Sequence, residues 1–143
     1  MAAELRFDED QRRAFQVIRQ AVDHGGAHVL LFGPGGSGKS AVALRALEGR
    51  LGFRCAVATA QAQRFGGPDG LNTQELLHVI KQQVKPQKHR YVESNATCRS
   101  IFGPRGAFVQ GKRFYIAIDE AGQMSGEHAL QIVDAVWKLC LST

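Results

Sequence analysis

Residues 28–49 read HVLLFGPGGSGKSAVALRALEG, and this stretch decides the predicted fold. The apolar run Val29–Phe32 leads into a glycine-rich loop, and a run of Ala, Val, Leu and Arg with helical character follows. The loop fits the pattern G-x-x-x-x-G-K-[ST], which binds phosphate groups when it lies between a strand and a helix. A strand, this loop and a helix in succession predict an α/β domain with a parallel sheet.

The residue types in the loop make phosphate the expected ligand. Glycines let the backbone wrap a phosphate so that its N–H groups converge, and the start of the helix adds a favourable dipole. We expect Lys39 to reach the β- and γ-phosphates of a nucleotide, and the Ser40 hydroxyl to ligate Mg²⁺. A glycine-rich turn without a ligand is the alternative. The predicted phosphate-binding set is Gly33, Pro34, Gly35, Gly36, Ser37, Gly38, Lys39 and Ser40.

A pair of carboxylates ends another apolar run, RFYIAIDE at residues 113–120. We expect Asp119 to hold Mg²⁺, directly or through water, and Glu120 to orient or deprotonate a water that attacks the nucleotide. An acidic pair after a strand can also mark no more than a turn. Together with the phosphate loop, the pair predicts a nucleoside triphosphatase with Lys39, Asp119 and Glu120 as its catalytic residues.

Periodicity and capping residues predict the remaining elements. Helices are expected over residues 9–23 and 39–48. A third helix is expected to begin at a capping box of Asn72 and Glu75 and to end at about residue 83, and a fourth to follow Ser125. Strands are expected over residues 29–32, 55–58 and 113–120, with a glycine-rich loop over residues 59–71. The last helix has a predicted apolar face of Ala129, Leu130, Val133, Val136, Trp137 and Cys140.

The net charge of +5 is concentrated in one region. Residues 81–113 carry one acidic residue, Glu93, against eight basic ones: Lys81, Lys85, Lys88, Arg90, Arg99, Arg105, Lys112 and Arg113. Basic side chains neutralise nucleic-acid phosphates and release counterions, so we interpret residues 84–112 as a basic insert that faces nucleic acid. A solvated surface loop is the other interpretation of the same charges.

Composition limits the class of protein. The length of 143 residues and the hydrophobic content of 44% predict that the chain forms one globular domain. No apolar run approaches the roughly 20 residues that span a membrane, which predicts a soluble chain without a secretion signal. Its three cysteines are too widely spaced for a metal cluster or a disulfide framework, so reduced thiols in an intracellular compartment are expected.

Five short segments together resemble a known family. QRRAF, GPGGSGKS, ATAQ, GLNTQELL and IDEAGQMS occur in the order found at the front of superfamily-one DNA helicases, and the Pif and RecD branch is the most similar. The resemblance implies a P-loop NTPase fold of the RecA-like kind, a three-layer domain with a parallel sheet. It also implies ATP and Mg²⁺ as ligands, single-stranded DNA as partner, and DNA unwinding in replication, repair or recombination.

The resemblance assigns further residues. Gln11 occupies the place of a glutamine that recognises adenine, and an amide suits this task because it both donates and accepts. Where the family contacts single-stranded DNA, Thr59 matches, whereas Gln61 replaces a proline and Gln74 a histidine. Arg64 and Phe65 would supply a phosphate contact and a stacking face, or else simply anchor a loop. The candidate DNA contacts are Thr59, Arg64, Phe65 and Gln74.

The resemblance covers only the front of such a motor. Residues 1–143 would correspond to a truncated N-terminal RecA-like helicase domain with an incomplete sheet, and the remaining helicase domains are expected in a longer chain. This fragment is expected to hydrolyse ATP feebly and to unwind no DNA alone. Its compartment would be the nucleus or mitochondrion in a eukaryote and the cytoplasm otherwise. Two alternatives are an ATP-binding nucleic-acid module without unwinding activity, and an unrelated AAA-type ATPase that remodels proteins.

Overall fold

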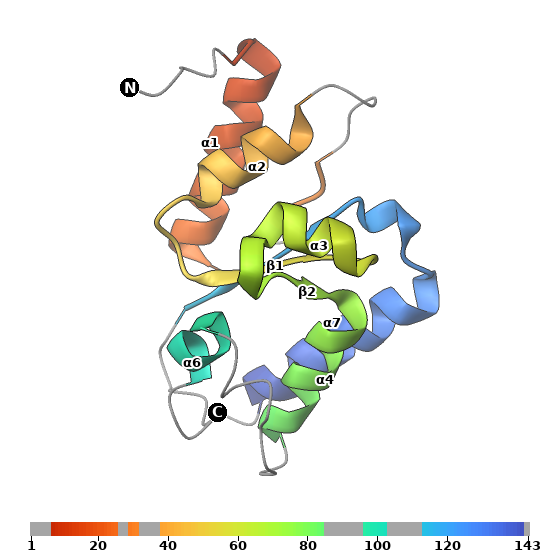
Figure 1. Ribbon diagram of the computed structural model, residues 1–143. Coiled ribbons are helices and arrows are strands. Elements are labelled where there is room, and N and C mark those ends of the chain that lie inside the picture. Colours follow the sequence, from red (N-terminus) through yellow and green to blue (C-terminus); the bar gives the residue numbers. More distant parts are fainter. Residues whose placement is uncertain (1–6, 26–28, 32–37, 85–95, 103–112, 142–143) are drawn as a thin grey trace. The chain divides into compact units, whose positions relative to one another are not determined.

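The computed structural model describes residues 7–25, 29–31, 38–84, 96–102 and 113–141 (Figure 1). The chain divides into two compact units, Met1–Arg50 and Leu51–Thr143. The first contains α1 (Glu9–His24) and α2 (Lys39–Leu47). The second contains β1 (Gly52–Ala56), α3 (Thr59–Gly66), β2 (Leu71–Asn72), α4 (Thr73–Val84), α6 (Ala96–Phe102), β3 (Tyr115–Asp119) and α7 (Gly126–Leu141).

Helix α1 begins where the predicted helix begins, because its first turn is capped. The Asp8 carboxylate accepts a hydrogen bond from the Gln11 backbone N–H at 2.8 Å, and the Gln11 side-chain oxygen accepts one from the Asp8 N–H at 2.9 Å. This reciprocal capping box satisfies two N–H groups that a helix start otherwise leaves without partners. Gly25 ends the helix with φ +75°, a conformation that favours glycine. The predicted helix over residues 9–23 is confirmed.

Helix α2 packs against α1 within the first unit. Its buried residues are Val42, Ala46 and Leu47. Arg19 of α1 donates hydrogen bonds to the carbonyls of Ala46 at 3.0 Å and Arg45 at 3.2 Å, so it caps the last turn of α2. The predicted helix over residues 39–48 is therefore confirmed to within one residue.

The strand expected over residues 29–32 is not found in its described part. Val29, Leu30 and Leu31 have no strand conformation, and Leu30 is 78% exposed. Phe32 lies outside the described residues. A strand exists only when its backbone groups bond to a neighbour, and the described sheet consists of β1, β2 and β3 alone.

The second unit is built on a parallel sheet with strand order β2-β1-β3. Side chains of β1 alternate between its two faces, as a strand requires. Phe53 and Cys55 join a core cluster with residues of α4, α6 and α7, whereas Ala56 is buried outside this cluster, and α3 packs on β1. The fold is thus α/β with a small three-stranded parallel sheet, as predicted at that level.

Two boundaries in this unit differ from prediction. The strand expected over residues 55–58 is β1, which ends at Ala56, and the loop expected over residues 59–71 contains helix α3. Only the second half of that stretch is rich in glycine, and Ala62 and Phe65 gain burial by helix formation, at 0% and 6% exposure. The prediction of a loop was wrong because contact with the sheet outweighs the local glycine signal.

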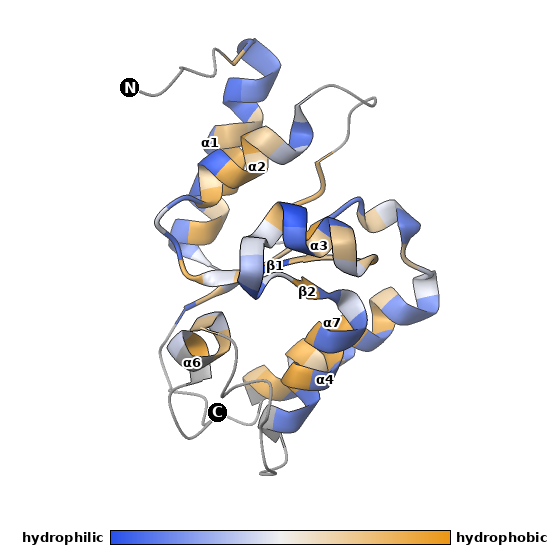
Figure 2. Cartoon of the chain, in the orientation of Figure 1, coloured by the Kyte–Doolittle hydropathy of each residue, from blue (hydrophilic) through white to orange (hydrophobic). Residues whose placement is uncertain are grey.

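The capping box of Asn72 and Glu75 is confirmed. The Asn72 side-chain oxygen accepts from the Glu75 N–H at 2.8 Å, and the Glu75 carboxylate accepts from the Asn72 N–H at 3.1 Å. Helix α4 follows and packs against α7, where Figure 2 shows apolar residues on both helices.

Of the predicted basic insert, the structure describes Val84 and α6, while residues 85–95 and 103–112 lie outside the described part.

Strand β3 confirms the third predicted strand, but it is half-buried along its whole length. Among the described residues it has a strand neighbour on one side only, which explains why the expected burial on both faces is not reached.

The predicted apolar face of α7 is wrong for most of its residues, although Val136 is half-buried against the core cluster. The Ser125 hydroxyl caps this helix, as expected, by accepting from the His128 N–H at 3.1 Å. The buried residues are Ile132, Ala135 and Leu139, while Leu130, Val133 and Trp137 are 70%, 55% and 63% exposed. The helix has more apolar residues than one face holds, so packing against α4 selects which ones are buried. In the described part of the chain, every helix is too short or too polar to cross a membrane.

Candidate functional site

One candidate site, in the first unit, is the start of α2. Gly38 precedes the helix with φ +79°, and Lys39 and Ser40 are its first two residues. Backbone N–H groups at a helix start, together with an ammonium and a hydroxyl, form a set of donors for an anion. The rest of the predicted loop, Gly33, Pro34, Gly35, Gly36 and Ser37, lies outside the described residues.

Gln11 lies beside this helix start. Its amide nitrogen is so close that a β-carbon added to Gly38 would lie 2.9 Å from Gln11 Nε2. The capping box explains this orientation, because the amide oxygen accepts from the Asp8 N–H and the nitrogen then faces Gly38. The residue that the resemblance assigns to adenine therefore lies next to the last glycine of the phosphate-loop motif.

A separate candidate site, in the second unit, is the carboxyl end of the sheet. The register places Asn72, Ala56 and Asp119 side by side on β2, β1 and β3. Because all three strands are parallel, their carboxyl ends share one edge, where α/β proteins bind ligands. Helix α3 starts at Thr59, three residues beyond the end of β1.

Two hydrogen bonds connect side chains along this edge. Gln61 Nε2 donates to Asp119 Oδ2 at 3.0 Å, and Asn72 Nδ2 donates to Thr59 Oγ1 at 2.9 Å. The first bond gives the predicted metal carboxylate an amide donor from α3. The second ties the start of α3 to the end of β2.

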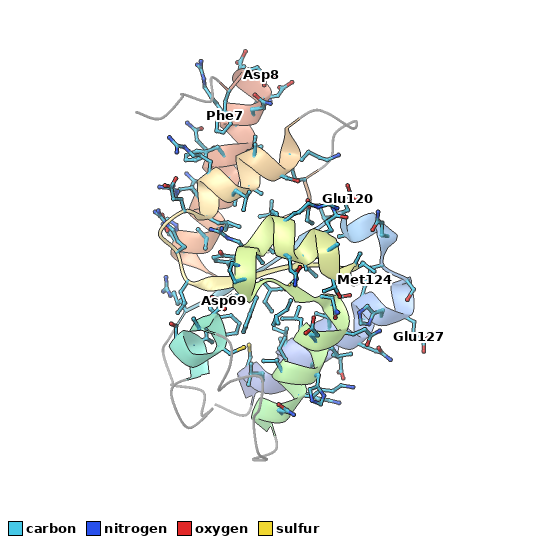
Figure 3. The ribbon with its side chains drawn as sticks, in the orientation of Figure 1. Phe7, Asp8, Asp69, Glu120, Met124 and Glu127 are labelled. Carbon is cyan, nitrogen blue, oxygen red and sulfur yellow. The ribbon has the colours of Figure 1, made fainter. Side chains whose placement is uncertain are left out.

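Glu120 has a backbone conformation that is uncommon for a residue with a side chain. Its φ of 50° and ψ of 49° are left-handed, and it precedes the short 3₁₀ turn Ala121–Gln123 (Figure 3). Such a conformation costs about 1–2 kcal/mol and is found more often at functional sites. Gln123 Nε2 donates to Glu120 Oε2 at 2.7 Å, so an amide also orients this exposed carboxylate.

The candidate DNA contacts have different environments. Arg64 and Gln74 are exposed on α3 and α4, and Thr59 is exposed at the start of α3. Phe65 is only 6% exposed, so its ring anchors α3 and offers no face on which a base could stack.

Sequence reasoning missed the roles of Gln61 and Asn72 at the carboxyl end of the sheet. The only signal was that Gln61 follows a predicted strand, at a position where the resembled family has a proline.

The side chains present fit Mg²⁺ in one specific way. No group of three or more metal-ligating residues occurs among the residues that the structure describes. Mg²⁺ at a nucleotide site usually takes one or two protein ligands together with phosphate oxygens and waters. The Ser40 hydroxyl and the Asp119 carboxylate are donors of this kind, and each would serve with the nucleotide phosphates as the main ligands.

Comparison of the chain with known protein families, with curated proteins and with solved structures gives no match.

Proposed function

We propose that the chain is the N-terminal RecA-like part of an ATP-dependent DNA helicase, which couples ATP hydrolysis to the unwinding of DNA. The observation that carries the proposal is the contact between the Gln11 amide and Gly38, at the start of the helix that Lys39 and Ser40 open. A phosphate loop alone is common to many ATPases. A glutamine amide next to its last glycine adds a group that distinguishes adenine, which favours this family over other P-loop enzymes.

In this proposal the first unit binds the nucleotide. The Lys39 ammonium neutralises charge on the β- and γ-phosphates, and the N–H groups at the start of α2 donate to phosphate oxygens. Gly38 favours glycine because of its positive φ, and the end of the Gln11 side chain lies close to where a β-carbon would be. The Gln11 amide, oriented by the capping box, reads the edge of the adenine ring.

The second unit supplies the groups for hydrolysis. Asp119 provides a negative charge for Mg²⁺, and Mg²⁺, when bound, offsets the charge of the phosphates. Glu120 accepts a proton from the attacking water or orients it. The hydrogen bonds from Gln61 and Gln123 hold these two carboxylates without neutralising them.

Single-stranded DNA is the proposed partner. Arg64 on α3 and Lys81 on α4 are exposed cations, and Arg113 is exposed just before β3. Cations in such positions contact phosphates with little dependence on base sequence. The burial of Phe65 removes one stacking surface, and this favours the second candidate, an ATP-binding nucleic-acid module that does not unwind DNA.

The experiment that tests the proposal measures ATP turnover with and without single-stranded and double-stranded oligonucleotides. We expect single-stranded DNA to stimulate turnover more than the duplex does, and Glu120→Gln to abolish the stimulated rate, which excludes a contaminating ATPase. Because this fragment is expected to unwind no DNA alone, a strand-displacement assay on a longer chain that carries the further helicase domains then separates the two candidates: the first displaces a strand, and the second binds ATP and DNA without doing so. Turnover that ignores DNA altogether would contradict both.

A further inference from the structure

Gln61 lies in the first turn of α3, at the carboxyl end of the sheet. The register of β1 and β3 sets Ala56 opposite Asp119, and α3 begins three residues after Ala56. The first turn of the helix is thereby brought to the end of β3. There Gln61 Nε2 donates to Asp119 Oδ2 at 3.0 Å, in a partly buried position.

The helix that carries Gln61 is firmly anchored. The next residue, Ala62, is fully buried, and Phe65 is buried one turn later. Gly66 lies against β1, because a β-carbon added there would be 2.8 Å from the Arg54 carbonyl oxygen. At the start of the helix, the Thr59 hydroxyl accepts from Asn72 of β2. The donor on Gln61 is therefore held by contacts on both sides of it in the sequence.

A neutral donor suits a carboxylate that has to hold a cation. An arginine or lysine at residue 61 would compete with Mg²⁺ by neutralising Asp119, whereas an amide fixes the side chain and leaves the negative charge in place. A proline at this position, as the resembled family has, possesses no side-chain donor. Gln61 therefore gives this chain a contact that the family pattern does not provide.

We infer that Gln61 is a positioning residue, which holds the Asp119 carboxylate in the orientation that receives Mg²⁺ with bound nucleotide. The inference rests on the proposed function, because it assigns Gln61 a task within that reaction. It predicts that loss of the amide raises the Mg²⁺ concentration that nucleotide binding needs and leaves the fold intact.

Gln63 offers a matched control. It lies on the same helix, two residues from Gln61, and is exposed. Gln61→Ala and Gln63→Ala therefore make the same chemical change in α3, and only the first removes a bond to Asp119. Gln61→Met, compared with Gln63→Met, removes the donor while it keeps the approximate size of the side chain and adds no charge, so a packing defect is separated from loss of the hydrogen bond.

The first readout concerns the free protein. Three-bond couplings between the backbone and the carboxyl carbon of Asp119 report whether its χ1 angle has one value or averages over rotamers. We expect one rotamer in the parent chain and in both Gln63 variants, and averaging in both Gln61 variants. An unchanged Asp119 coupling in Gln61→Ala would overturn the inference.

The second readout is the Mg²⁺ concentration for half-maximal binding of a fluorescent ATP analogue. We expect this concentration to rise roughly three- to tenfold in Gln61→Ala, the range for one lost hydrogen bond, with binding recovered at high Mg²⁺. Equal values for Gln61→Ala and Gln63→Ala would also overturn it. A parent chain that binds no analogue at any Mg²⁺ concentration contradicts the proposed function itself, and this result is visible before any variant is made.

Discussion

The side-chain amide of Gln11 occupies the space that a β-carbon on Gly38 would need, with only 2.9 Å between that carbon and Gln11 Nε2. The glutamine that caps α1 and the glycine that precedes α2 thus lie next to each other within the first unit. The contact connects the capping of α1 to the start of α2, where Lys39 and Ser40 lie.

Gly38→Ala is expected to reduce both stability and nucleotide binding. The variant meets a left-handed φ of +79° and the Gln11 amide, whereas Gly49→Ala meets a similar φ of +77° with nothing within 4 Å. We expect backbone strain of about 1–2 kcal/mol in each variant, and a further loss only at residue 38. Urea unfolding measures the difference between the two. Equal destabilisation would show that the Gln11 contact is readily relieved.

Lys39→Ala is expected to weaken triphosphate binding strongly, because the variant lacks the ammonium proposed to contact the β- and γ-phosphates. Lys138→Ala is a suitable control, since Lys138 lies on α7 in an exposed ion pair with Asp134 at 3.0 Å. Titration with a labelled ATP analogue measures both affinities. Unchanged affinity in Lys39→Ala would refute the assignment of the phosphate site.

Two substitutions at Glu120 separate the role of its carboxylate in hydrolysis from the strain of its left-handed backbone. Glu120→Gln is expected to retain ATP binding and lose hydrolysis, because an amide is no base. Glu120→Gly is also expected to lose hydrolysis, but to stabilise the fold by about 1 kcal/mol, since glycine accepts the observed φ of 50°. Chemical denaturation and single-turnover hydrolysis are the measurements. A parental rate in either variant would exclude Glu120 as the base.

The three cysteines are expected to differ in reactivity. Cys55 and Cys98 are fully buried, and Cys140 is exposed. Burial, with a smaller contribution from Cys98, raises the pKa of the Cys55 thiol to about 12. A thiol reagent at pH 8 should therefore modify Cys140 quickly and the other two only after unfolding, as mass spectrometry would show. Fast labelling of Cys55 in the folded chain would contradict this.

The raised pKa also predicts the direction of a pH effect. Above about pH 8.5 the thiol ionises in the unfolded chain while the folded chain retains its proton. The stability that Cys55 contributes is thus complete below that pH and is lost as the pH rises towards 12. We expect the free energy of unfolding to fall less steeply between pH 8.5 and 10 in Cys55→Ala than in the parent.

Removal of Lys81 and Arg113 is expected to reduce the salt dependence of oligonucleotide binding. Both side chains are exposed and lie in the basic region. Each phosphate contact contributes about one unit to the slope of log affinity against log salt, so the double alanine variant should lose up to about two units. Lys138→Ala should leave the slope unchanged. An unaltered slope in the double variant would identify these cations as solvated surface.

Capping chemistry is the part of the fold that the sequence alone determined. Asp8 with Gln11, Asn72 with Glu75, and Ser125 with the His128 N–H each start a helix where it was predicted. These contacts span three residues, so they depend on local sequence and little else. The phosphate-loop pattern and the acidic pair were likewise recognisable as short local strings.

Tertiary structure decided what depends on partners distant in sequence. Helix α3 forms in place of a loop because Ala62 and Phe65 are buried there, and packing against α4 selects Ile132, Ala135 and Leu139 as the buried face of α7. The bond between Gln61 and Asp119 joins residues 58 positions apart, through the register of two strands. Burial and strand register depend on two elements in contact, whereas a sequence pattern describes only one element at a time.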